Sequence, residues 1–223
     1  MHTMHSETKS TAAPETAGLT LHQAGQYDFF SRLVGLGVNQ ANSRMVVEMA
    51  KLKPGDKVLD VGCGTGNLTL TAKEYVGPTG SVTGIDASPE MIDKARRNAV
   101  HSGLEAAFEV GLIEKIPYPA GSFDAVINRL MIHHLPNDLK RQGLAETLRV
   151  LRPGGLIFIA DFKAQTDTLL GHLALAFARH RRMQTDEWGL TQLVQEAGFD
   201  EVASGPTRSV FLAFVSGRKP KVS

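Results

Sequence analysis

Val58-Leu-Asp-Val-Gly-Cys-Gly-Thr-Gly66 is the stretch that decides the fold. Its first four residues read as a short buried strand, and the residues from 67 to 75 are predicted to form a helix. Three glycines lie between them at alternate positions: Gly62, Gly64 and Gly66. Glycine permits positive φ and a close backbone approach, and a helix start offers unpaired N–H groups. This combination predicts a site for a nucleotide-like ligand.

A second apolar segment, residues 81–85, ends in Asp86, which follows Gly66 by twenty positions. An acid at that distance lies at the tip of the neighbouring strand, where it can accept hydrogen bonds from ribose hydroxyls. Dinucleotide-binding folds use G-x-G-x-x-G, whereas the third glycine here comes one residue early. Asp60 would also lie unfavourably beside a phosphate. A ligand with a positive centre and no phosphate fits this turn better than a dinucleotide does. A nicotinamide-dependent oxidoreductase is therefore the less favoured alternative.

These segments resemble the class I S-adenosylmethionine-dependent methyltransferases, and most of all those of quinone biosynthesis and other small molecules. The similarity runs from about Tyr27 to Pro220 and includes the Arg152-Pro-Gly-Gly155 turn. It implies an α/β fold, a three-layer Rossmann-like sandwich with a seven-stranded, mostly parallel sheet in the order 3-2-1-4-5-7-6. The last strand is expected to be antiparallel. S-adenosyl-L-methionine is the cofactor that the resemblance implies.

The resemblance also implies which residues bind the cofactor. The Tyr-Asp-aromatic opening at Tyr27 is similar to a helix that lies over the methionine end of the cofactor, although a simple packing helix explains it equally well. Related enzymes have an aspartate for adenine where this chain has Leu112, so we expect backbone groups around Ile113 to take its place. The expected cofactor-binding residues are Tyr27, Asp60, Gly62, Gly64, Gly66, Asp86, Ala87, Met91, Ile113, Asn128 and Arg129.

Residues 128–136 follow the predicted fourth strand, at the switch in strand order where ligands bind in open α/β sheets. His133 and His134 are the catalytic candidates, because imidazole titrates near neutrality and acts as a general base. The alternative is that one histidine packs and holds the loop. Asp161, at the exit of the fifth strand, either binds substrate or caps the next segment. No His, Cys and carboxylate cluster has metal-ligand spacing, so no metal is expected.

A composition rich in Ser, Thr and Ala with no periodicity predicts a disordered tail over residues 1–20. The length favours a single methyltransferase domain over 21–223, with N-terminal cover helices. Within these, Ser43 is predicted to cap a helix that runs through Leu52. Apolar residues at helical spacing predict a lid-like helix over about 165–183, with core packing as the alternative. Its basic end suggests transient contact with a membrane surface.

Composition narrows the function further. A net charge of +1 and the lack of a basic stripe argue against nucleic acid as a partner. The single cysteine, Cys63, excludes an intrachain disulfide and is expected to pack rather than react. No signal peptide or apolar span is seen, so a cytoplasmic location is expected. The sequence thus predicts a methyltransferase acting on a small apolar molecule (a quinol, phenol or lipid-like amine), with a non-catalytic S-adenosylmethionine-binding protein as a further alternative.

Overall fold

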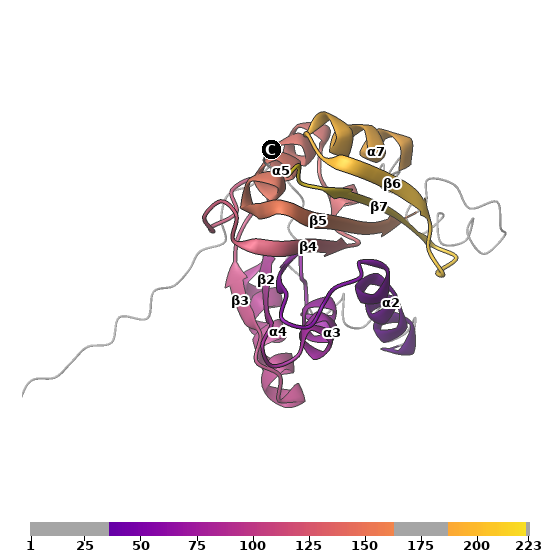
Figure 1. The fold of residues 1–223 in the computed structure, drawn as a ribbon. Coiled ribbons are helices and arrows are strands. Elements are labelled where there is room, and N and C mark those ends of the chain that lie inside the picture. Colours follow the sequence, from indigo (N-terminus) through magenta and orange to yellow (C-terminus); the bar gives the residue numbers. More distant parts are fainter. Residues whose placement is uncertain (1–35, 163–186, 222–223) are drawn as a thin grey trace, which may run out of the picture.

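The computed structural model describes residues 36–162 and 187–221, which build one twisted sheet with helices on both faces (Figure 1). Tyr27, the tail over 1–20 and the predicted lid helix lie outside the described residues. Within the described part the sheet has seven strands in the order β3-β2-β1-β4-β5-β7-β6, as predicted. The strands are β1 Lys57–Val61, β2 Ser81–Asp86, β3 Ala107–Val110, β4 Phe123–Arg129, β5 Leu151–Phe162, β6 Asp200–Pro206 and β7 Leu212–Arg218.

Strands β1 to β5 run parallel, and β7 is antiparallel to both of its neighbours, β5 and β6. The order switches between β1 and β4, which pair directly. Because β1 is covered on both faces, its alternate residues enter different cores: Val58 packs with one cluster and Leu59 with another. This explains why Val58 to Val61 are all buried instead of alternating between buried and exposed.

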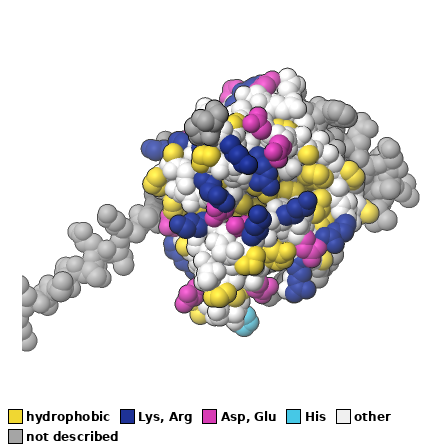
Figure 2. Space-filling view, in the orientation of Figure 1, with side chains coloured by type: hydrophobic (Ala, Val, Ile, Leu, Met, Phe, Trp, Pro, Cys, Tyr) yellow, Lys and Arg dark blue, Asp and Glu magenta, His cyan; other side chains and the backbone are white. Residues whose placement is uncertain are grey.

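The helices divide between the two faces (Figure 1). Those described are α2 Leu36–Met49, α3 Asn67–Val76, α4 Pro89–Ser102, the 3₁₀ turn η1 Ile132–His134, α5 Asn137–Val150 and α7 Glu187–Glu196. Helices α2, α3 and α4 lie on one side, and α5 and α7 pack on the other. In the described part of the chain no helix has both the length and the apolar character needed to cross a membrane. The face drawn in Figure 2 carries lysine and arginine side chains among hydrophobic ones.

The helix-start signals were only partly correct. Ser88 caps α4 as predicted, since its Oγ accepts the N–H of Met91 at 3.3 Å and Pro89 is the first helical residue. The cap predicted at Ser43 was wrong, because α2 is already formed at Leu36 and Ser43 lies in its middle with no exposed surface. Ser43 lies three and seven residues before the buried Val46 and Ala50, so it shares their inward face.

Candidate functional site

The glycine turn after β1 is held against the end of β2 by backbone hydrogen bonds. The N–H groups of Gly62 and Cys63 donate to the carbonyl of Ile85 at 2.8 and 3.0 Å. Its glycines are required by backbone conformation, with φ of +73° at Gly62, +53° at Gly64 and +84° at Gly66. A Cβ on Gly66 would also meet the ring of Phe108 at 2.9 Å. The turn therefore brings backbone groups close to the carboxyl edge of the sheet.

Asp86 links this turn to the start of α4. Its Oδ2 accepts the N–H of Gly64 at 2.9 Å, and its Oδ1 accepts the N–H of Ser88 at 2.9 Å. Burial raises the pKa of Asp86 above its usual value, while these two hydrogen bonds oppose that shift. Each carboxylate oxygen has two acceptor positions, so Asp86 retains acceptor capacity for a ligand after fixing the turn.

Asp60 lies one strand away and is almost completely buried. Its Oδ2 accepts the hydroxyl of Thr69 at 2.6 Å, but its Oδ1 has no hydrogen-bond partner. Burial raises the pKa of Asp60 from 3.8 to about 7, although the hydrogen bond from Thr69 and the charge of Arg129 act in the opposite direction. A buried acceptor without a partner is costly, so this carboxyl group is suited to a ligand that brings a donor or a positive charge.

Asn128, at the end of β4, shows the same feature. Its Nδ2 donates to the carbonyl of Val61 at 2.9 Å, which ties β4 to β1 beside the switch point, while its buried Oδ1 has no partner. Two orphaned acceptors, on adjacent strands and near the same edge, mark the place where a polar ligand completes the structure.

Met131 joins the glycine turn to the loop after β4. Its side chain crosses Gly62 so closely that a Cβ there would lie 2.3 Å from the Cγ of Met131. Leu130, immediately before it, adopts a left-handed φ of +57° and donates its N–H to the carbonyl of Ala160 at 2.9 Å. Strained backbone of this kind is concentrated at functional sites, and here it directs Met131 onto the turn.

His133 and Asp161 form a buried pair that the sequence analysis did not connect. The Nδ1 of His133 lies 2.6 Å from Oδ1 of Asp161, and the backbone N–H of His133 donates to Oδ2 at 3.1 Å. Their side chains are 2% and 4% exposed, respectively. Asp161 also accepts the N–H of Phe162 at 2.8 Å. Three hydrogen bonds therefore fix the carboxylate, and the carboxylate fixes the imidazole.

Three further side chains surround this pair. The ring of His134 lies 4.0 Å from that of His133, and the ring of Phe162 lies 5.1 Å away in an edge-to-face arrangement. Lys140, in the first turns of α5, is half-buried, and burial lowers its pKa while the negative charge of Asp161 acts against that shift. Phe162 and Lys140 were not expected at the site, since neither carries a motif and only the fold brings them near the histidines.

The remaining predicted residues differ in what they present. Met91 and Ile113 are buried, and the side chain of Ile113 packs against Gly143 of α5, so only its backbone groups are available at the edge. Leu112 forms an isolated bridge with Lys115. Cys63 is buried against Gly84, and burial together with the nearby acids raises its pKa well above the usual value. Such a thiol is not poised to react as a nucleophile.

Comparison with known proteins agrees with this geometry. A family model described as a methyltransferase domain matches residues 58–155, which span the glycine turn and both strands at the switch point. Over 236 residues the chain is 27% identical to the ubiquinone/menaquinone biosynthesis C-methyltransferase UbiE of Pseudomonas aeruginosa strain LESB58, covering 95% of this chain and 91% of that protein.

Solved structures give the same result. The crystal structure of an S-adenosylmethionine-dependent methyltransferase from Aquifex aeolicus is similar with a TM-score of 0.65 and 25% identity, over 79% of this chain and 89% of that one. The [4+2]-cyclase SpnF shares the fold with a TM-score of 0.67 and 21% identity, over 82% of this chain and 81% of that one.

The chain is therefore a class I S-adenosylmethionine-dependent methyltransferase. Within that class it is related to the group that acts in quinone biosynthesis. S-adenosylmethionine is the cofactor, and the residues at the carboxyl edge fit it. The orphaned acceptors of Asp60 and Asn128 suit a ligand that carries positive charge and N–H donors, and the remaining acceptor positions of Asp86 suit ribose hydroxyls.

Proposed function

We propose that the chain methylates a small apolar acceptor with an ionisable hydroxyl group, such as a quinol or a phenol, and that His133 is the general base. The contact between His133 and Asp161 carries this proposal. A carboxylate that accepts from Nδ1 holds the proton on that nitrogen, so the lone pair of the imidazole is left on Nε2. A base oriented in this way serves an acceptor that must lose a proton, which favours a hydroxyl acceptor over a neutral lipid-like amine.

S-adenosylmethionine supplies a methyl group activated by the positive charge on its sulfur. The acceptor would take that methyl group on its oxygen or on an adjacent ring carbon as the bond between methyl and sulfur breaks and its electron pair returns to the sulfur. The proton that the acceptor loses would pass to Nε2 of His133. Asp161 stabilises the imidazolium that results. Alignment of the two reactants can contribute roughly 7–11 kcal/mol, and a positioned base adds about 10²–10⁴-fold. His134, in ring contact with His133, supports its orientation and borders the acceptor.

The surroundings of the pair support an aromatic or otherwise apolar acceptor. Phe162 is 38% exposed beside the His133 ring, and Met131 and Leu135 are half-buried around it. An apolar ring placed against these side chains keeps the methyl acceptor away from water, which is the usual character of a small-molecule site.

At the cofactor end we assign each role by chemistry. Asp86 receives the ribose hydroxyls, and Asp60 and Asn128 face the positively charged methionine end, where Arg129 is placed to meet its carboxylate. Backbone groups at Gly62, Gly64, Gly66, Ala87 and Ile113, with the Met91 side chain, line the nucleoside.

The test is methyl transfer from isotopically labelled S-adenosylmethionine to a panel of quinols, phenols, amines and phospholipids, followed by mass spectrometry. We expect label in a hydroxyl-bearing aromatic acceptor, and a much lower rate for His133→Ala and His133→Gln than for His134→Ala. Cofactor affinity, measured by calorimetry, should stay close to that of the unsubstituted chain in all three variants. Labelled amines alone, or equal rates for His133→Ala and the unsubstituted chain, would contradict the proposal.

A further inference from the structure

The turn between β6 and β7, residues 207–211, is a rigid hairpin tip. The backbone N–H and the hydroxyl of Thr207 donate to the carbonyl of Leu212 at 3.2 and 2.8 Å. The N–H of Ser209 donates in turn to Oγ1 of Thr207 at 3.1 Å. The conformation of the tip is therefore fixed by its own hydrogen bonds, and this conformation determines which of its side chains are exposed.

This tip exposes apolar side chains where turns usually carry polar ones. Val210 is 70% exposed and Phe211 is 38% exposed. Leu212, which follows them, pairs in register with Phe162, whose ring contacts His133. The hairpin tip thus lies at the same edge of the sheet as the catalytic pair, and it extends the apolar surface that begins at Phe162.

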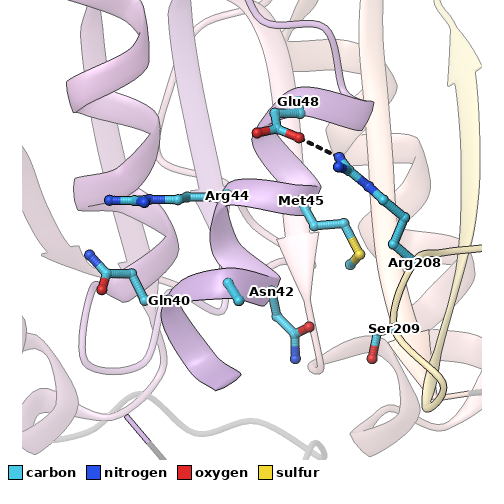
Figure 3. Close-up of a pocket in the computed structure, with 8 residues that line it drawn as sticks. Gln40, Asn42, Arg44, Met45, Glu48, Arg208 and Ser209 are labelled. Carbon is cyan, nitrogen blue, oxygen red and sulfur yellow. Dashed lines mark hydrogen bonds and ion pairs between the residues drawn. The ribbon is translucent and has the colours of Figure 1, made fainter. Parts of the chain in front are cut away.

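A pocket of about 430 Å³ adjoins the tip, between it and residues 40–48 of α2 (Figure 3). Glu48 of α2 is paired with Arg208 of the tip across this pocket, whereas Arg44 has no ion-pair partner among the described residues. In Figure 3 the side chains of Arg44 and Arg208 lie on opposite sides of α2, and that of Arg208 points toward Glu48. The pocket is lined by Gln40, Ala41, Asn42, Arg44, Met45, Glu48, Arg208 and Ser209.

The exposed apolar tip and the separated arginines of the pocket together favour binding to an extended surface over binding to a small ligand. A single anion requires donors that converge on it, but the two guanidinium groups diverge and one is already paired with Glu48. An extended anionic surface with an apolar interior satisfies Arg44, which has no ion-pair partner among the described residues, and also the exposed Val210 and Phe211.

We propose that the hairpin tip and the rim of the adjoining pocket bind the surface of an anionic lipid bilayer. Val210 and Phe211 enter the acyl boundary, and Arg44 and Arg208 lie at the level of the headgroups. The inference rests on the proposed function, because an apolar acceptor dissolved in the bilayer would then reach Phe162 and His133 at the same edge. With two apolar side chains and two cations the binding is weak and reversible.

The first experiment is sedimentation of the full chain with vesicles, without acceptor or methyl transfer. We expect binding to phosphatidylglycerol–phosphatidylcholine vesicles and little binding to phosphatidylcholine alone. The double variant Val210→Ser/Phe211→Ser should bind about tenfold more weakly, and Arg44→Gln about fivefold more weakly. Matched controls lie on α4: Val100→Ser, which is 85% exposed, and Arg97→Gln should bind as the unsubstituted chain does.

A second readout uses the chemistry of the chain itself. Because Cys63 is its one cysteine and is buried, Val210→Cys can be labelled selectively with an environment-sensitive dye, with Val100→Cys as the control. Anionic vesicles should shift the emission of the dye at 210 and leave that at 100 unchanged. Inorganic phosphate should not displace the labelled protein from vesicles except through its ionic strength.

Several results would overturn the proposal. One is equal vesicle binding by the unsubstituted chain and Val210→Ser/Phe211→Ser, and another is no binding to anionic vesicles at all. A dye response at 210 to saturable phosphate alone would assign the pocket to a soluble anion, and a response to protein concentration alone would assign the tip to a second copy of the chain. Since none of these readouts involves methyl transfer, they are distinct from a failure of the proposed activity.

Discussion

The Nδ1 atom of His133 lies 2.6 Å from Oδ1 of Asp161, although the two residues are 28 positions apart in the chain. The pair is built by the ends of two neighbouring strands, because η1 follows β4 and Asp161 lies near the end of β5. Parallel strands bring their carboxyl ends to one edge. That geometry makes the pair the most informative target for mutation.

Asp161→Asn should reduce turnover by about 10²–10⁴-fold, because an amide in this position no longer holds the proton on Nδ1 of His133. Cofactor affinity should change little, which separates this effect from a general disturbance of the site. The measurements are steady-state kinetics over a range of pH and calorimetry with S-adenosylmethionine. Asp138→Asn, on the exposed first turn of α5, is the matched control. An unchanged pH profile with normal turnover would remove Asp161 from the mechanism.

Asp86→Ala should weaken cofactor binding by about tenfold or more, since hydrogen bonds to a charged group contribute about 1.5–3 kcal/mol. The substitution also removes the acceptor for the N–H groups of Gly64 and Ser88, so a moderate loss of thermal stability is expected with the fold retained. Calorimetry and circular dichroism report the two effects separately. The exposed Asp93→Asn on α4 should match the unsubstituted chain, and equal cofactor affinity in Asp86→Ala would refute the assignment.

Asp60 should make both stability and cofactor binding depend on pH. Its pKa is raised from 3.8 to about 7 in the folded chain, so between these values the folded state keeps a proton that the unfolded state has released. The stability that this contributes is complete below about pH 4 and is lost as the pH rises through 7. Urea unfolding at pH 5 and pH 7.5 should show this loss in the unsubstituted chain and a smaller one in Asp60→Asn.

The same carboxyl group should release its proton when the positively charged cofactor binds. Calorimetry near pH 6 in two buffers of different ionisation enthalpy measures that release directly. We expect it to be present in the unsubstituted chain and to be smaller in Asp60→Asn, where Arg129 and Asp86 remain as the neighbouring charges. Identical proton release in both proteins would place the titration on another group.

Gly62→Ala should destabilise the chain more than its backbone angle alone requires. The left-handed conformation costs an alanine about 1–2 kcal/mol, and the added methyl group also collides with Met131. Gly121→Ala is a matched control, since its φ is +72° and nothing lies within 4 Å of the added atom. The midpoint temperature of thermal unfolding should be lower for Gly62→Ala than for Gly121→Ala. Met131→Ala should relieve only part of the collision, because its Cβ would still lie 2.8 Å from the added methyl group, and it should leave the backbone strain unchanged.

The glycine turn could be predicted from local patterns, whereas the strand order was implied by the resemblance to the class I methyltransferases. Apolar runs, alternate glycines and the acid at 86 are visible within short windows. The cap at Ser43 was wrong because a serine on the inward face of a helix looks the same in sequence as one at its start. The helix start predicted at Ser88 was correct, and there a second sequence signal, the proline that follows, supported the capping residue.

The pairing of His133 with Asp161 could not be predicted in this way. Each residue was noted as a candidate, but their partnership depends on the register of β4 with β5, which no local pattern encodes. Phe162 and Lys140 were missed for the same reason, because an aromatic strand end and a helix lysine carry no chemical signature. They are recognised as part of the site only because the tertiary fold brings them close to the His133–Asp161 pair.

The contact between Gly62 and Met131 has a consequence for how this enzyme can change. Met131 contacts the glycine turn and is two residues from His133, so one side chain lies between the cofactor-binding turn and the proposed base. Substitutions near Met131 that change the affinity for the methyl donor are expected to shift the proposed base as well. Substitutions that admit a new acceptor are expected to shift the turn that binds the donor. Selection for either property must therefore act on both at once.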